Sequence, residues 1–215
     1  MKGPITVKRA LALVSIPAAL AVGLTACGDD NDSGDSKSGG SMSGHSMSMS
    51  ASPSTGGAQA GRHNDQDVMF AQMMIPHHRQ AIEMADLAAA RASSPEVKSL
   101  AADIKKAQTP EIQRLSGWLS AWGASVPSPG MGGMHHGGTE GMMSDDDMKK
   151  LGAAKGAAFD KAFLQMMIKH HEGAVAMAKT EQSAGQFADA KSMAAGIVSS
   201  QSAEITKMRS LLQKQ

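Results

Sequence analysis

The sequence predicts an all-α protein, a four-helix bundle built from two tandem helical hairpins. Residues 67–119 align without a gap with residues 160–212, an offset of 93 (160 minus 67). In both copies Ala, Leu, Met, Lys, Glu and Gln dominate, and apolar residues recur in steps of three and four, which favours amphipathic helices. Since one hairpin cannot bury its apolar face alone, we expect the two hairpins to pack on each other.

Residues 1–27 resemble a bacterial lipoprotein signal. Positive charges near the start precede the apolar run 11–22, and Leu24-Thr25-Ala26-Cys27 ends it with small residues before a cysteine. Cys27 would then be lipidated, and the protein would be secreted across the cytoplasmic membrane and anchored to its outer face. A simple secretory signal or an N-terminal membrane anchor is the alternative, although the apolar run is short for a span. Cys27 is the only cysteine, which excludes an intrachain disulfide and a cysteine-based zinc site.

Two segments have the composition of linkers. Residues 28–63 are rich in Ser, Gly, Asp and Met and predict a disordered tether between the membrane and the bundle. A Met/His/Gly-rich linker, 123–144, separates repeat one, 64–122, from repeat two, 145–215, within the predicted bundle 64–215. Incidental Met in solvated linkers is one interpretation, and weak auxiliary metal binding is the other, through Met131, Met134, His135, His136 and His45.

Local signals place the helices. Asn64 or Asp65 is a suitable N-cap for a helix over 65–91, and Ser94 before Pro95 starts a second helix over 95–122. Ser144 and the acidic residues after it predict a short extra helix before position 152. The second repeat then predicts helices over 156–184 and 187–213.

One cassette occurs on the first long helix of each repeat. Phe70-Ala-Gln-Met-Met-Ile-Pro-His-His78 returns as Phe163-Leu-Gln-Met-Met-Ile-Lys-His-His171. Thioethers and imidazoles together favour copper, above all Cu(I), with Cu(II), Ag(I) or Zn as alternatives. Core filling is the alternative role of each methionine. The predicted metal ligands are His77, His78, His170, His171, Met73, Met74, Met166 and Met167.

Polar residues interrupt the apolar stripes of the second helices. Antiparallel pairing within a hairpin sets Gln108 level with His77 and Glu111 level with Met74, and buried polar groups need partners. We therefore expect a central polar layer in which His77 and His170 approach each other across the core. The next histidine in each copy, about 100° round the helix, is expected at the bundle's edge or exposed. A metal-free hydrogen-bond network is the alternative. The candidates for outer partners or additional ligands are Glu111, Glu204, Gln108, Gln201, Asp67 and Asp160, although a helix dipole explains the two aspartates equally well.

The paired motif Asp-x-x-Phe-x-x-x-Met-Ile-x-His-His-x-x-Ala-x-x-Met-Ala resembles the secreted bacterial family known as domain of unknown function 305, which is placed in the ferritin-like superfamily. The resemblance covers nearly all of residues 64–215. It implies a ferritin-like helical bundle of two repeats and an association with extracytoplasmic copper binding. It implies no established enzyme activity.

These features predict an extracytoplasmic copper-binding protein that buffers, sequesters or delivers the metal. Its expected partners are the metal ion, the membrane through Cys27 and other copper-handling proteins. A net charge of +1 gives no basis for nucleic-acid binding, and no nucleophile with an adjacent base is evident, so an enzyme is not favoured. Two alternatives stay open: a metal-dependent oxidoreductase of ferritin-like type and a metal-free structural interaction module. Di-iron chemistry is disfavoured because no Glu stands three residues before any of the four cassette histidines.

Overall fold

The computed structural model describes residues 61–128 and 140–214. The expected signal with its lipidation site at Cys27 and nearly all of the first linker lie outside the described residues. So do the five auxiliary metal-binding candidates, which are His45, Met131, Met134, His135 and His136.

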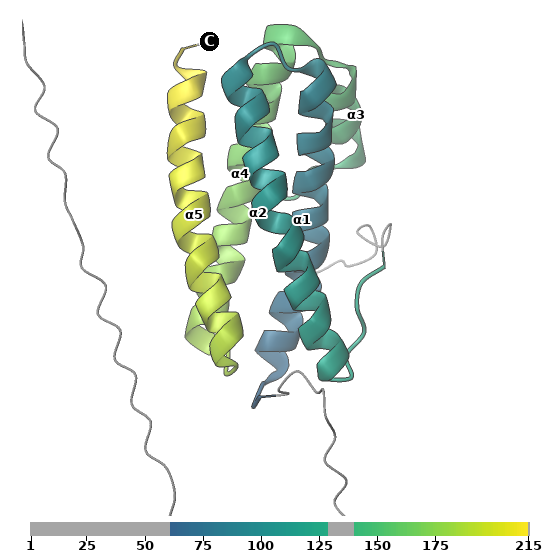
Figure 1. Ribbon diagram of the computed structural model, residues 1–215, viewed down its shortest axis with the longest axis vertical. Coiled ribbons are helices and arrows are strands. Elements are labelled where there is room, and N and C mark those ends of the chain that lie inside the picture. The colour runs from purple at the N-terminus through teal and green to yellow at the C-terminus, as the bar shows by residue number, and fades with distance from the viewer. Residues whose placement is uncertain (1–60, 129–139, 215) are drawn as a thin grey trace, which may run out of the picture. The chain divides into compact units, whose positions relative to one another are not determined.

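Five helices make up the described part of the chain, which contains no strand (Figure 1). They are α1 (Asp65–Arg91), α2 (Pro95–Ala121), α3 (Asp145–Ala153), α4 (Gly156–Ala184) and α5 (Ala188–Leu212). The predicted all-α class is confirmed, and each expected boundary of the four long helices lies within one residue of the observed one. The short helix α3 continues past its expected end before position 152 to Ala153.

Side-chain caps explain why the predicted starts are correct. The Asn64 side chain accepts hydrogen bonds from the first turn of α1, and the Asp67 carboxylate bonds back to the Asn64 backbone. Ser144 and Asp147 form the same reciprocal box at the start of α3. Ser94 caps α2, whose first residue is Pro95. Such caps satisfy N–H groups that have no partner within the helix, so the sequence alone locates them.

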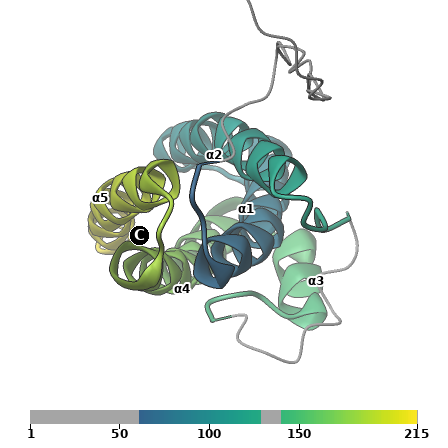
Figure 2. The same cartoon turned by 90° about the horizontal axis from the view of Figure 1, so that it is seen from below.

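The long helices form a bundle in which α1 and α4 make the contact between the hairpins. α1 packs on α2, α4 packs on α5, and α1 packs on α4. Viewed along the bundle, the four long helices surround a common core, and α3 lies outside them next to α1 (Figure 2). α1 and α4 therefore each contact two long helices, and their buried surfaces are wider than a single stripe.

Each hairpin turn is held by an aspartate of the other hairpin. The Asp67 carboxylate on α1 accepts hydrogen bonds from the backbone N–H groups of Gln186 and Phe187, in the α4–α5 turn. The Asp160 carboxylate on α4 accepts from Ser93 and Ser94, in the α1–α2 turn. The two contacts lie at opposite ends of the bundle, so α1 and α4 run antiparallel.

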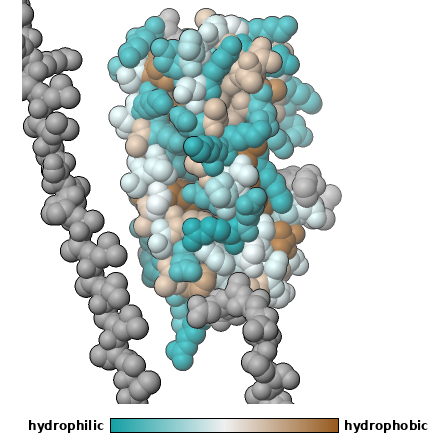
Figure 3. All heavy atoms as spheres, viewed as in Figure 1, coloured by the Kyte–Doolittle hydropathy of each residue, from teal (hydrophilic) through white to brown (hydrophobic). Residues whose placement is uncertain are grey.

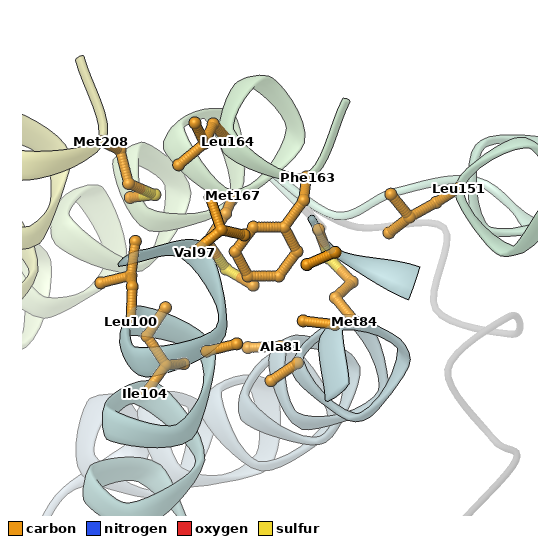
Figure 4. Close-up of a cluster of buried hydrophobic side chains, with 14 of the residues drawn as sticks. Ala81, Met84, Val97, Leu100, Ile104, Leu151, Phe163, Leu164, Met167 and Met208 are labelled. Atoms are coloured by element: carbon orange, nitrogen blue, oxygen red, sulfur yellow. The ribbon is translucent and has the colours of Figure 1, made fainter. Parts of the chain in front are cut away.

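The apolar core consists of two clusters. One contains Met84, Val97, Ile104, Phe163 and Met167, whose side chains converge between the helices in Figure 4. The other is built by residues at corresponding positions, shifted by 93, and includes Phe70, Met74, Ala174 and Ile197. The cassette histidines lie along α1 and α4 between the residues of these two clusters, so a polar layer divides the apolar core.

The face of the molecule shown in Figure 3 has no large apolar patch, because hydrophobic residues are scattered among hydrophilic ones there. In the described ranges the large hydrophobic residues that are exposed are Met69 and Val126. None of the described helices is long and apolar enough to cross a membrane.

Candidate metal centre

Two histidines meet at the centre of the bundle. His77 on α1 and His170 on α4 have ring centroids 3.7 Å apart, with the ring planes inclined by 40°. The two residues are 1% and 0% exposed. The expectation that they approach each other across the bundle agrees with this geometry, which follows from their equivalent positions on two antiparallel helices.

The imidazole nitrogens of this pair make no well-formed hydrogen bond. Both ring nitrogens of His77 and both of His170 are buried without a partner. Burial lowers the pKa of His77 to about 3, helped by the nearby His78 and His171, and the backbone of Glu140 acts in the opposite direction. Burial and the neighbouring histidines also hold the pKa of His170 well below its usual range. The pair is therefore neutral at physiological pH, and each ring offers a nitrogen lone pair to a metal.

The second histidine of each cassette is also buried, which corrects the expectation that it lies at the edge or exposed. His78 and His171 are both 0% exposed. The prediction was wrong because it assumed one buried stripe per helix. α1 contacts α4 on one side and α2 on the other, so the side chain that points away from α4 still meets another helix.

The glutamates pair with these second histidines. His78 Nε2 lies 2.7 Å from Glu111 Oε2, and His171 Nε2 lies 2.7 Å from Glu204 Oε2. The register expected from the sequence, with Glu111 level with Met74, is therefore wrong by about one helical turn of α1. The glutamates are 25% and 21% exposed, so each connects a buried imidazole to the surface. The Nδ1 atoms of both histidines have no partner.

Two amides extend the polar layer. Gln108 on α2 and Gln201 on α5 are each 3% exposed, and neither Oε1 atom has a hydrogen-bond partner. They are inward-facing, as the interrupted stripes predicted. A layer with so many unpaired polar atoms is costly unless something binds there.

The cassette methionines flank the layer at two depths. Met74 and Met167 are fully buried in the two apolar clusters. Met73 and Met166 are half-buried, one helical turn before His77 and His170. Core packing thus accounts for part of their role, and the i,i+4 spacing puts a thioether beside each imidazole of the central pair.

Asp67 and Asp160 are occupied elsewhere. Their carboxylates hold the hairpin turns at the two ends of the bundle, as described above. Burial acts to raise the pKa of Asp67, but Glu181 and the backbone N–H groups of Asn64, Phe187 and Gln186 outweigh it and lower that pKa. We therefore leave both aspartates out of the site.

The donor set fits a soft ion of low coordination number. Within residues 61–128 and 140–214, no group of three or more His, Cys, Asp or Glu side chains is placed to hold a metal ion. An ion held by His77 and His170 would have two imidazole nitrogens and would need thioether sulfur to complete its shell. That combination suits Cu(I) and Ag(I) better than metals that require several oxygen ligands.

Glu181 is a buried acid that sequence reasoning missed. It is 0% exposed on α4, next to the Asp67 carboxylate, and neither of its carboxyl oxygens makes a well-formed hydrogen bond. Burial and the neighbouring Asp67 carboxylate raise the pKa of Glu181 to about 8. The signal was present in the repeat, because the position 93 residues earlier is Ala88 and a charged residue there breaks an apolar stripe.

This acid predicts a loss of stability with rising pH. The unfolded chain ionises Glu181 near pH 4.5, whereas the folded chain keeps it neutral until about pH 8. Between these values the folded state binds the extra proton, so the free energy of unfolding should fall as the pH rises. Glu181→Gln should remove this part of the decline. Urea unfolding of both proteins from pH 5 to pH 9 measures the difference, and parallel pH profiles would contradict the assignment.

Comparison with known proteins gives a family match. The family model described as Domain of unknown function (DUF305) matches residues 67–212. None of the curated proteins matches the chain. A solved structure from Streptomyces coelicolor, described as a secreted DUF305 protein, is 38% identical with a TM-score of 0.63 and covers 69% of this chain and 93% of its own.

Two further structures are of one protein, CopM. Its Cu(I)-bound form is 33% identical to this chain, with a TM-score of 0.58, and its Cu(II)-bound form is 36% identical, with a TM-score of 0.61. Each match covers 69% of this chain and 96% of CopM.

Proposed function

The chain belongs to the family described as Domain of unknown function (DUF305), and on that premise we propose that it is an extracytoplasmic copper-binding protein that buffers, sequesters or delivers the metal. The copper ion is cargo. The site provides ligands and a dry environment, and no group in the layer has the arrangement of a nucleophile with its base.

The central observation is the His77–His170 pair. Two neutral imidazoles touch each other in the core, and their ring nitrogens have no hydrogen-bond partner. Buried polar groups are almost always paired, so four unpaired nitrogens at one point indicate a ligand. A metal-free network, the structural alternative, would need hydrogen bonds at these same atoms, and their lack in the described residues argues against it.

The surrounding residues have distinct roles in this proposal. His77 and His170 would hold the ion, and Met73, Met74, Met166 and Met167 would add thioethers that favour the reduced form. His78 and His171 would serve as adjacent ligands, oriented by Glu111 and Glu204 through the observed bonds. The two carboxylates would also offset the positive charge of a bound ion without making contact with it.

CopM, which has Cu(I)-bound and Cu(II)-bound forms, supports copper as the cargo. The S. coelicolor relative, described as secreted, supports a location outside the cytoplasm. Lipidation at Cys27 would keep the protein at the outer face of the cytoplasmic membrane, where other copper-handling proteins could receive the ion. Mass spectrometry of the membrane-bound protein tests this anchor, and a mature chain that starts elsewhere without lipid would contradict it.

The methionines provide the test of metal preference. Changing Met73, Met74, Met166 and Met167 to Leu keeps most of the apolar volume and removes the thioethers. We expect the affinity for Cu(I) and Ag(I) to fall by at least about tenfold, because loss of even a residue that only supports a metal ligand costs about 10–100-fold. The affinity for Cu(II) should fall less. Competition titrations with chelators of known affinity measure each ion.

Met69→Leu is the matched control, because Met69 is exposed on the same helix. It should bind all three ions as the unmodified protein does. Equal losses for Cu(I) and Cu(II) in the fourfold variant would show that the methionines act only through packing. No binding of Cu(I) or Ag(I) by the unmodified protein would overturn the proposed function.

A further inference from the structure

A short segment crosses the bundle beside the histidine pair. We call Glu140–Met143, which leads into α3, the strap. The Gln80 side chain on α1 clamps one end of it: Gln80 Nε2 donates to the Met143 carbonyl at 2.9 Å, and the Met143 N–H donates to Gln80 Oε1 at 2.7 Å. Gln80 lies one helical turn after His77, and Met143 is buried. The clamp therefore sits next to the centre of the site.

The other end of the strap lies directly on the backbone of α4. A Cβ atom at Gly173, one turn after His170, would stand 2.0 Å from the Glu140 carbonyl oxygen and 2.8 Å from the Gly141 Cα. A Cβ at Gly141 would stand 3.0 Å from the His170 carbonyl oxygen. Gly141 also has a φ of +85°, a conformation that disfavours other residues. The strap can lie this close only because both positions are glycine.

The two repeats are specialised for this contact. Gly173 and Gln80 occupy equivalent positions, since 173 minus 93 is 80. At one position the chain has a side chain that binds the strap, and at the other it has no side chain, which makes room for it. The strap thus spans from α1 to α4 over the level of the pair.

We propose that the strap Glu140–Met143 covers the His77–His170 pair and controls the exchange of metal at it. This inference rests on the proposed copper-binding function and adds a route: the ion enters and leaves between α1 and α4 when the strap lifts. The two hydrogen bonds to Gln80 and the close contact at Gly173 hold it closed. Closure slows exchange and leaves the ligand set unchanged.

Two variants unseat the strap by different means. Gly173→Ala inserts a methyl group where the Glu140 carbonyl lies, and Gln80→Ala removes both clamp hydrogen bonds. Gly196→Ala is the matched control, because it makes the same substitution within a helix where no atom lies within 4 Å of the added Cβ. Circular dichroism confirms that each variant is folded.

The first measurement is transfer of Ag(I) or Cu(I) from the loaded full chain to an excess of chelator. Transfer should become about tenfold faster or more in both strap variants, while the number of ions bound is unchanged. Gln80→Ala loses the hydrogen bonds that hold the closed state, and in Gly173→Ala the added methyl group displaces the Glu140 carbonyl. Gly196→Ala should transfer at the unmodified rate. Unmodified rates in both strap variants would overturn the proposal.

A second measurement does not depend on metal. Diethyl pyrocarbonate modifies accessible imidazoles, and mass spectrometry locates the modified residues. In the apo protein His77 and His170 should react several times faster in the strap variants than in Gly196→Ala. If the unmodified protein binds no metal yet this difference appears, the strap covers the pair and the proposed function fails. Equal reactivity in all variants would overturn the strap as a cover, whether or not metal binds.

Discussion

Replacing His77 and His170 together by Leu should abolish copper binding and stabilise the apo protein. Loss of both central imidazoles should lower Cu(I) affinity by more than about a hundredfold. This exceeds the loss of about 10–100-fold that follows when a residue supporting a metal ligand is removed. The same change removes four buried nitrogens that have no partner. Since each unpaired buried group costs about 1–3 kcal/mol, the free energy of unfolding should rise by about 2 kcal/mol or more.

The adjacent histidines give a matched comparison with the opposite sign. His78→Leu with His171→Leu breaks the two bonds to Glu111 and Glu204. The apo protein should then lose about 2 kcal/mol of stability or more, because each hydrogen bond to a charged group contributes about 1.5–3 kcal/mol. Urea unfolding of the apo forms and Cu(I) competition titration measure both quantities. An apo protein that is destabilised by the central pair of substitutions would show that His77 and His170 are structural.

Single substitutions test whether the pair is one site. With His77→Leu, the remaining His170 has lost its partner in the same ligand set, so His170→Leu should cost much less copper affinity in that background than in the unmodified protein. Additive losses in this double-mutant cycle would indicate two separate sites, one for each repeat.

Acid should unfold the apo protein through the same two imidazoles. The unfolded chain protonates them near pH 6.5, whereas the folded chain keeps His77 neutral down to about pH 3 and also lowers the pKa of His170. Below pH 6.5 the unfolded state therefore binds more protons, and stability is lost as the pH falls through this window. The slope should approach about 1.4 kcal/mol per pH unit for each imidazole.

The difference between two proteins isolates this effect. Carboxylates titrate in the same range, but they are common to the unmodified protein and to the His77→Leu/His170→Leu variant, so their contributions cancel. The gap in the free energy of unfolding should change steadily between pH 6.5 and pH 4. A constant gap over that range would mean that the pair is already protonated in the folded state or is open to solvent.

Helix positions were predictable because their signals are local. Asn64, Ser94 and Ser144 cap their own helices, and the apolar steps of three and four persist along each helix. Recurrence of the cassette at an offset of 93 residues also led correctly to His77 and His170 as opposed residues on two helices. Propensity, periodicity and capping agree along the whole bundle, which is why the predicted boundaries were close.

The remaining features depend on how helices rotate against each other, which spacing does not determine. His78 is buried because α2 covers the side of α1 that does not contact α4. Glu111 bonds to His78 because α2 is rotated about its axis so that this side chain faces α1. Asp67 holds a turn that is 120 residues away in the sequence, at Phe187. Asp160 holds a turn that is 66 residues away, at Ser94. The strap depends on a single difference between repeats, Gln80 against Gly173, whose meaning appears only when the backbone that crosses them is located.

Anomalous diffraction at the copper edge tests the central claim most directly. Crystals of the mature protein loaded anaerobically with Cu(I) should give their strongest anomalous peak at the centre of the bundle, within bonding distance of ring nitrogens of both His77 and His170. Met sulfur from the cassettes should lie in the same shell. A strongest peak anywhere else, with the two central imidazoles still packed against each other, would contradict the copper site proposed for this protein.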